Sequence, residues 1–159
     1  GEIPRPQKGM LLLFYGGKNP DAAASFHEGE SVEFFYSGVP SGTQQAYECG
    51  SWIVRDGEVA VKDWDEWVGI MTNRDPRTVI GLKDGHTVVL LTVDGRQPGY
   101  SQGLTAKELA GLLLSYGIDN AAMLDGGAST EMIVDGRIVN RPSYKGTERP
   151  VGGGLIVLK

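Results

Sequence analysis

Five Asp-Gly pairs interrupt this chain of 159 residues, and they constrain its fold more than any other feature. Asp-Gly suits a tight β-hairpin turn, because both residues tolerate a positive φ angle. Three of the pairs, Asp56-Gly57, Asp84-Gly85 and Asp135-Gly136, have β-forming runs close on both sides. These runs predict hairpins over residues 51–61, 78–93 and 131–140. A chain with several hairpins is expected to form a largely antiparallel sheet.

One helix is indicated by the stretch LTAKELAGLLLSYG, residues 104–117. Thr105 and Glu108 have the spacing of a capping box, and the leucines that follow fall on one helical face. Gly117 stands where a glycine commonly ends a helix. A second, shorter helix is expected over residues 63–69.

Further elements are expected nearer the two ends of the sequence. Residues 10–15 and 31–38 are predicted strands, with a short helix around 20–26 between them, and residues 152–159 form a last strand. The predicted fold class is α+β, with a largely antiparallel sheet, several hairpins and one or two packed helices. The whole of residues 1–159 is expected to form a single domain.

Composition excludes several classes of function. The net charge of −5 argues against a protein that binds nucleic acid or a membrane surface through a basic stripe. Cys49 is the only cysteine, so the chain has neither an internal disulfide nor a CxxC zinc pattern. No apolar run approaches the roughly 20 residues that a membrane-spanning helix needs.

Two of the Asp-Gly pairs do not fit a hairpin. Asp94 ends an apolar strand and precedes RQPGYSQG, which cannot form a paired return strand, so Asp94 and Arg96 stand in a strand-end loop. Asp125 opens DGGAST, a loop whose amides have little side-chain cover. Such a loop is either an ordinary turn or an anion site formed by backbone N–H groups with the hydroxyls of Ser129 and Thr130.

Arginines are the second group of candidate binding residues. Arg74 and Arg77 stand just before a predicted strand, and Arg149 lies in the later stretch TERPVGGG. A guanidinium group suits two-point binding of phosphate or carboxylate. The pattern by itself favours the alternative, that these are solvated loop arginines.

Common catalytic motifs are missing from the sequence. There is no GxSxG elbow, no GxxxxGK[ST] phosphate loop, no HExxH pair and no GxGxxG after a strand. His27 and His86 are the only histidines, so a Ser-His-Asp triad is not expected. Catalysis would rest on carboxylates, arginines and hydroxyls, which suit glycosyl or phosphate-ester chemistry.

Four sequence blocks, taken in order, resemble the phosphodiester glycosidase family. They are RTVIG at 77–81, VDGR at 93–96, the capped helix, and LDGGAS at 124–129. The similarity extends from about Ile3 to the end of the chain. The resemblance implies a hydrolase that cleaves the glycosidic bond of a sugar-1-phosphodiester, of the N-acetylglucosamine type, and releases free sugar and a phosphomonoester.

The same resemblance implies an active site. Asp125, Asp94 and Arg77 are the implied catalytic residues. The predicted substrate-binding residues are Thr78, Arg96, Gly126, Gly127, Ser129, Thr130 and Arg149. Arg77, assisted by Arg149, would hold the phosphate together with the loop amides and the Ser129 hydroxyl.

One of the two aspartates would act as nucleophile or as the base that activates water. We favour Asp125 for this step and Asp94 for orientation or for contacts with sugar hydroxyls. The distance between the two carboxylates would decide between retention and inversion. No metal ligand is predicted, and no cofactor; Ca²⁺ or Mg²⁺ could bind two loop aspartates, but the spacing does not imply it.

The family domain normally begins with an earlier segment that has no match here. We therefore expect the chain to lack that N-terminal segment, so that the segment itself or a second chain would complete the domain. The expected partner is a phosphodiester-linked glycan, and neither nucleic acid nor membrane insertion is expected. Such glycans indicate a secreted or cell-envelope location.

Two other functions fit the same residues. One is a non-catalytic carbohydrate or cell-wall binding module of the same fold, and the other is a structural or interaction domain. Aromatic side chains that line a groove would favour the module. Trp52, Trp64 and Trp67 are nevertheless expected to be core residues, at strand and helix positions.

Overall fold

The computed structural model describes residues 7–8, 24–33, 40, 42–43, 46–47 and 49–158. The chain divides into two units, Gly1–Ala46 and Tyr47–Lys159. The strands predicted at 10–15 and 31–38 and the helix predicted around 20–26 lie wholly or partly outside the described residues. The second unit contains every predicted site residue.

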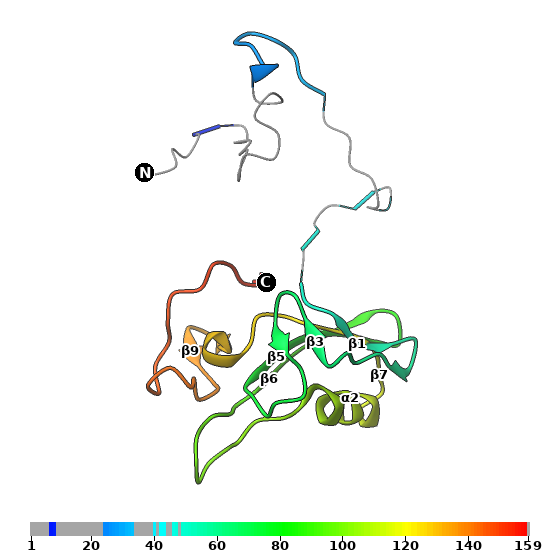
Figure 1. Ribbon diagram of the computed structural model, residues 1–159, viewed down its shortest axis with the longest axis vertical. Helices are drawn as coiled ribbons and strands as arrows, with labels where there is room; N and C mark the ends of the chain where they lie inside the picture. The colour runs from blue at the N-terminus through cyan, green and yellow to red at the C-terminus, as the bar shows by residue number, and fades with distance from the viewer. Residues whose placement is uncertain are drawn as a thin grey trace. The chain divides into compact units, whose positions relative to one another are not determined.

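A five-stranded antiparallel sheet forms the centre of the second unit (Figure 1). The elements of the second unit, in chain order, are β1 (Trp52–Arg55), β2 (Glu58–Val59), β3 (Trp64–Asp65), β4 (Gly69–Ile70), β5 (Arg77–Lys83), β6 (Thr87–Val93), α2 (Ala106–Ser115), β7 (Ile118–Met123), the 3-10 turn η1 (Gly127–Ser129), β8 (Ile133–Val134) and β9 (Arg137–Ile138). The strand order is β2-β1-β7-β5-β6, and β3-β4 and β8-β9 form separate pairs. The predicted α+β class is confirmed.

The three predicted hairpins are present. Asp56-Gly57 joins β1 to β2 and Asp135-Gly136 joins β8 to β9, each as a two-residue turn. Both residues of each pair have positive φ angles, as the turn type requires. The third hairpin joins β5 to β6 through Asp84, Gly85 and His86.

Helix α2 begins and ends as the sequence predicts. The Thr105 hydroxyl accepts a hydrogen bond from the Glu108 amide at 3.2 Å, and the Glu108 carboxylate accepts one from the Thr105 amide at 3.0 Å. Leu109 and Leu113 are fully buried on the face that packs against β1, β2 and β7 (Figure 1). Burying these leucines stabilises the unit and fixes one face of the sheet.

The helix predicted over residues 63–69 is wrong, because this segment forms the hairpin β3–β4. The Asp65 carboxylate accepts hydrogen bonds from the amides of Trp67 and Val68, at 2.8 and 2.9 Å. A side chain that bonds the amides two and three residues on competes with the helical pattern and holds a turn instead.

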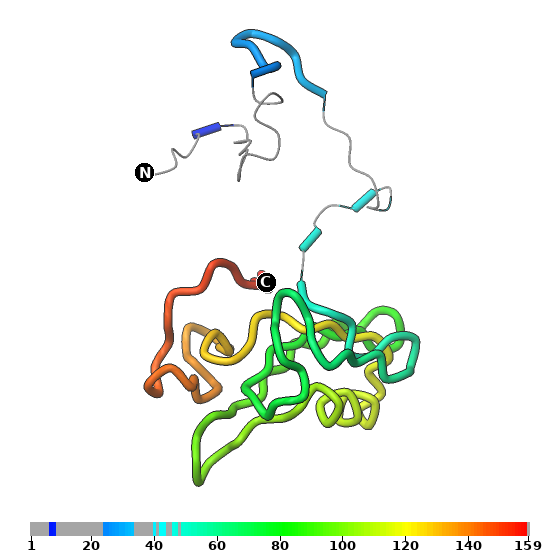
Figure 2. Tube along the Cα trace, in the orientation of Figure 1, coloured from blue at the N-terminus to red at the C-terminus, as the bar shows by residue number. Residues whose placement is uncertain are grey.

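The last strand predicted over residues 152–159 is also wrong for its described part. Residues 152–158 have no regular secondary structure, and their backbone makes no hydrogen bond to another backbone group within the described residues. Figure 2 shows the chain after β9 as an irregular arc, coloured orange to red. Three consecutive glycines, Gly152 to Gly154, raise the entropy cost of fixing an extended conformation here.

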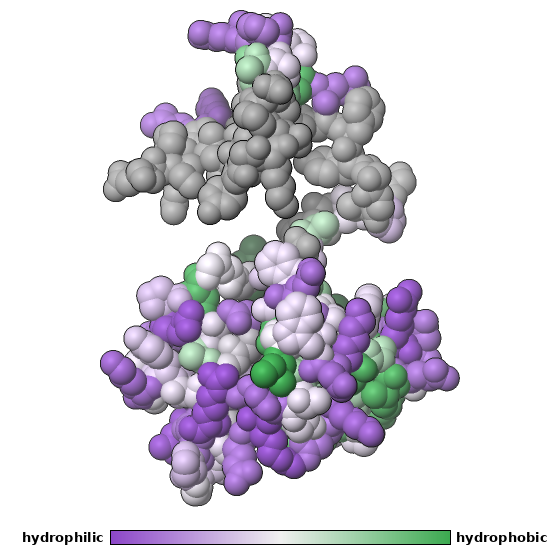
Figure 3. Space-filling model, viewed as in Figure 1, coloured by the Kyte–Doolittle hydropathy of each residue, from purple (hydrophilic) through white to green (hydrophobic). Residues whose placement is uncertain are grey.

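The tryptophans are not core residues as predicted. Trp52, Trp64 and Trp67 are 46%, 58% and 67% exposed. The core is filled instead by aliphatic residues of α2, β1, β5 and β7, and the two-residue strands β3 and β4 cover too little to bury an indole ring. Hydrophobic residues form small separate patches on the face shown in Figure 3. Within the described part of the chain, no helix is long and apolar enough to cross a membrane.

Candidate active site

Three loops meet beside the sheet: the loop before β5, the loop between β6 and α2, and the loop after β7. Asp75 and Leu104 exchange backbone hydrogen bonds, and the Gly127 amide donates to the Pro76 carbonyl at 2.9 Å. A Cβ atom on Gly95 would lie 2.6 Å from the Pro76 nitrogen, closer than real Cβ contacts allow. A Cβ on Gly126 would lie 3.0 Å from the Pro76 oxygen. Glycine therefore lets these backbones approach closely enough to form one site.

These loops enclose a polar pocket of about 280 Å³. We define the polar pocket by its lining residues: Trp67, Val68, Asp75, Arg77, Arg96, Met123, Asp125, Gly126, Gly127, Ala128, Ser129 and Arg149. Seven of the ten predicted site residues are among them, and the other three, Asp94, Thr78 and Thr130, are not. The sequence blocks thus converge in space, while the individual roles remain predictions.

The charged groups of the polar pocket are partly paired. The Arg96 Nε donates to the Asp75 carboxylate at 2.6 Å, so these two charges offset each other. The Arg96 guanidinium also lies over Gly127, where an added Cβ would come within 3.1 Å of Nη1. Arg149 and the exposed carboxylate of Asp125 complete the charged lining.

Arg77 is buried, and most of its guanidinium holds the backbone. Its Nε donates to the Leu104 carbonyl at 3.0 Å, and its Nη2 donates to the Asn73 carbonyl at 2.6 Å. Nη1 has no acceptor among the described residues. Burial lowers the pKa of Arg77; the nearby Asp75 carboxylate acts against this shift, and Arg96 adds to it. Arginine nevertheless remains a cation at neutral pH. Nη1 is the nitrogen that can still donate hydrogen bonds to an anion.

The glycine-rich loop presents a different set of amides from the predicted one. The Gly127 amide is engaged by Pro76, and the Ser129 and Thr130 amides close the η1 turn. The Gly126 and Ala128 amides make no hydrogen bond within the described part of the chain. These two amides are therefore the backbone donors left for an anion in the polar pocket.

Asp94 does not line the polar pocket, and both of its carboxylate oxygens accept hydrogen bonds. It accepts hydrogen bonds from the Tyr100 hydroxyl at 2.9 Å, from the Asn140 side-chain amide at 3.0 Å and from the Arg141 amide at 3.0 Å. The bond to Asp94 raises the pKa of Tyr100. These contacts join the 94–101 loop to residues 140–141, which favours the predicted orienting role over direct chemistry.

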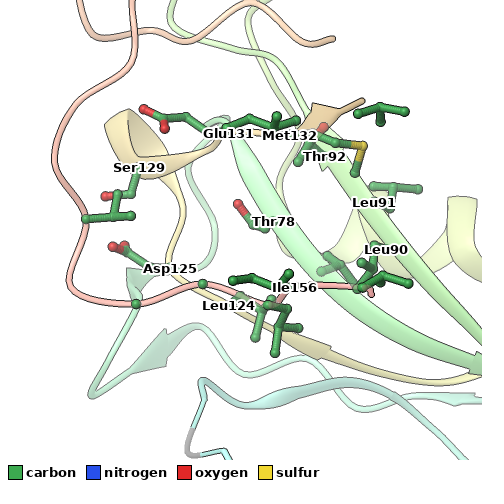
Figure 4. A pocket seen from close by; sticks show the side chains of 18 of the residues that line it. Thr78, Leu90, Leu91, Thr92, Leu124, Asp125, Ser129, Glu131, Met132 and Ile156 are labelled. Carbon is green, nitrogen blue, oxygen red and sulfur yellow. The ribbon is translucent and has the colours of Figure 1, made fainter. Parts of the chain in front are cut away.

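Thr78 lines a second, larger pocket, and the buried Thr130 is the hydrogen-bond partner of Thr78. Thr130 is buried, and its hydroxyl accepts a hydrogen bond from the Thr78 hydroxyl at 3.2 Å. Thr78 lines a mainly apolar pocket of about 780 Å³ between β5, β6 and the C-terminal segment. We call it the apolar pocket. Figure 4 shows Asp125 and Ser129 on one side of it and Leu90 and Leu91 on the other.

Three residues contribute to the site although the sequence did not indicate them as site residues. Asp75 pairs with Arg96, Trp67 lines the polar pocket, and Asp65 holds the loop that carries Trp67. Asp75 stands in RDPRT, between two arginines. Its position in a loop just before a predicted strand was the feature that could have indicated a site residue. No group of three or more His, Cys, Asp or Glu residues that could hold a metal ion occurs among the described residues.

Comparison with known proteins identifies the family. The sequence profile described as phosphodiester glycosidase matches residues 8–158. The chain belongs to the phosphodiester glycosidase family. The resemblance expected from the four sequence blocks is therefore confirmed.

Two relatives match this chain over a small part of their own length. The SPbeta prophage-derived uncharacterized protein YomE of Bacillus subtilis (strain 168) is 35% identical over 119 residues, which span 75% of this chain and 18% of that protein. The N-acetylglucosamine-1-phosphodiester alpha-N-acetylglucosaminidase of Bos taurus is 26% identical over 106 residues, spanning 58% of this chain and 19% of that protein. The chain thus spans under a fifth of either relative.

Among solved structures, a hypothetical protein from Synechocystis has a similar fold. It matches with a TM-score of 0.51 and 23% identity, over 62% of this chain and 18% of that one. At this identity the match supports the fold alone.

Proposed function

We propose that this domain hydrolyses the glycosidic bond of a sugar-1-phosphodiester, with a sugar of the N-acetylglucosamine type. One observation supports this most directly: the exposed carboxylate of Asp125 lines the same pocket as Arg149 and Arg77. A phosphodiester substrate needs this combination, an anion site next to a carboxylate. Family membership supports the same reaction class.

The phosphate would be held by cations and amides together. Arg149 and Arg77 supply positive charge, and the Gly126 and Ala128 amides with the Ser129 hydroxyl supply neutral donors. These donors stabilise the negative charge that grows on the leaving phosphate as the bond breaks. A phosphate leaves readily, so a strong general acid is less necessary than in an ordinary glycosidase.

Asp125 would act on the sugar side of the same bond. The bond between the anomeric carbon and the phosphate oxygen breaks, its electron pair stays with the phosphomonoester, and the oxygen of water ends on the anomeric carbon. Asp125 either attacks that carbon first or removes the proton from the attacking water. The anomer first released, observed by NMR, distinguishes the two routes, because a covalent intermediate gives retention. Asp94 would position the loop that carries Arg96.

The test is turnover of an N-acetylglucosamine-1-phosphodiester by the full chain and by Asp125→Asn. We expect kcat of the variant to fall by about 10²- to 10⁴-fold, the contribution typical of a positioned acid or base. Asp84→Asn is the matched control, because it changes an Asp-Gly pair in a hairpin outside both pockets. Near wild-type turnover by a folded Asp125→Asn would overturn this assignment.

The exposed tryptophans support a second candidate function, a non-catalytic carbohydrate or cell-wall binding module. Saturable sugar binding without turnover by the wild-type chain would favour the module. For either function we propose a phosphodiester-linked glycan as the ligand and a secreted or cell-envelope parent protein.

A further inference from the structure

Trp67 is placed unusually for a tryptophan. Its side chain is 67% exposed, and it lines the polar pocket, whose remaining walls are formed largely by charged residues and glycines. Among the described residues that line the polar pocket, Trp67 is the one aromatic residue. An indole ring that lies open to water beside a charged pocket leaves a large apolar face available to a ligand.

The loop that carries Trp67 is braced rather than loose. The buried carboxylate of Asp65 accepts hydrogen bonds from the amides of Trp67 and Val68 through one oxygen. Its other oxygen accepts from the Ser51 amide at 2.8 Å and from the Ser51 hydroxyl. Burial alone would raise the pKa of Asp65, but these hydrogen bonds outweigh it and lower the pKa. The carboxylate thus stays ionised and keeps the loop in place.

Packing against the central strand further restricts this loop. Gly50 lies between the loop and the end of β7, where an added Cβ would come within 3.0 Å of Val68 and 3.2 Å of the Met123 carbonyl. Val68 and Met123 both line the polar pocket beside Trp67. The loop therefore has a fixed position relative to Asp125, which follows β7 by two residues.

The two ends of a sugar phosphodiester differ in the contacts they need. The phosphate needs charge and N–H donors, whereas the C–H face of a pyranose ring packs on an aromatic plane. We propose that Trp67 is the stacking platform for the sugar ring of the substrate, in the same polar pocket as the phosphate-binding groups. This inference rests on the proposed function, and it makes Trp67 a residue that determines specificity for the sugar.

Trp64 provides a matched control for this proposal. It lies on the same β3–β4 hairpin and is 58% exposed, yet it lines neither pocket. Replacing Trp64 or Trp67 by alanine removes an exposed indole ring from the same local structure. An effect confined to Trp67 therefore reports its place at the pocket.

The experiment compares steady-state kinetics on an N-acetylglucosamine-1-phosphodiester for the wild type, Trp67→Ala, Trp67→Phe and Trp64→Ala. We expect Trp67→Ala to raise KM by about tenfold, the effect of losing one good aromatic contact, with kcat changed far less. Trp67→Phe should recover most of the loss, and Trp64→Ala should match the wild type. Equal KM values for both alanine variants would overturn the Trp67 assignment. Turnover by the wild type would still support the proposed hydrolase function in that case.

If the wild type shows no turnover, the proposed function fails and a binding readout decides on Trp67 alone. The indole N–H signals in a ¹H–¹⁵N spectrum are followed during titration with N-acetylglucosamine and with its 1-phosphate, and Trp67→Phe identifies the Trp67 signal. A saturable shift of that signal, absent for the Trp64 indole, supports the sugar platform. No shift of the Trp67 signal, or an equal shift of both signals, overturns it.

Discussion

The polar pocket and the apolar pocket share Asp125 and Ser129, but different contacts hold their walls. The loops around the polar pocket are joined by backbone hydrogen bonds and by glycine contacts too close for any other residue. One wall of the apolar pocket is the C-terminal segment, and backbone hydrogen bonds do not tie its described residues 152–158 to the described chain.

This difference indicates which pocket keeps its shape without a ligand. Preformed donors are effective in catalysis because they need no rearrangement as charge develops. The polar pocket meets that condition, since its loops are fixed by contacts within the fold. The apolar pocket depends on a segment whose Ile156 is 82% exposed, so its volume depends on that segment staying in place.

Among changes to the pocket walls, the largest expected effect comes from breaking the close packing of the polar-pocket loops. Gly95→Ala places a Cβ against the backbone of Pro76 and should lower the free energy of unfolding by about 3 kcal/mol, the upper range for overpacking. Urea denaturation measures the change. Gly152→Ala, with nothing within 4 Å of its added Cβ, is the control and should stay within about 0.5 kcal/mol of wild type. Equal stability of the two variants would contradict the packing described.

A smaller effect is expected at Asp94. The variant Asp94→Asn turns an N–H group toward one of the three groups that donate to Asp94. It should lower the free energy of unfolding by about 1–3 kcal/mol. Tyr100→Phe removes one donor only and should cost less. The pKa of Tyr100, raised by the bond to Asp94, should fall in Asp94→Asn, and an absorbance titration measures it. Unchanged stability and pKa with lost activity would restore Asp94 as a direct catalytic candidate.

The smallest effect is expected in the C-terminal segment. Ile156→Ser should change the free energy of unfolding by less than about 0.5 kcal/mol, because little of this side chain leaves water on folding. The buried counterpart Ile53→Ala should lose about 2–5 kcal/mol in the same measurement. A comparable loss at Ile156 would show that the segment packs firmly against the sheet.

Local patterns in the sequence predicted the elements that local interactions determine. Two-residue Asp-Gly turns and the Thr105–Glu108 capping box depend on neighbouring residues, and both are present. The β3–β4 hairpin was missed because one side chain, Asp65, overrides the helical pattern of residues 63–69. The tryptophans were predicted to lie in the core because large aromatic rings are usually buried. That rule failed here because too little structure surrounds these rings.

The candidate site shows a different limit. Arg77 and Asp94 were predicted as site residues from the sequence. Their hydrogen-bond partners Leu104 and Asn140 lie 27 and 46 residues further along the chain. Whether a guanidinium holds a phosphate or a backbone carbonyl depends on such distant contacts. Residue type and spacing could therefore locate the loops that meet, but not the direction in which each side chain points.

The central place of β7 also sets the order in which this domain can be built. The β1–β2 and β5–β6 hairpins are local, but β1 and β5 are joined only through β7. During synthesis from the N-terminus, the sheet must wait until residue 123 has been made. Asp125 follows two residues later. The event that closes the sheet therefore also positions the candidate catalytic carboxylate, so a nascent chain that stops before β7 lacks both the strand that joins these hairpins and the site.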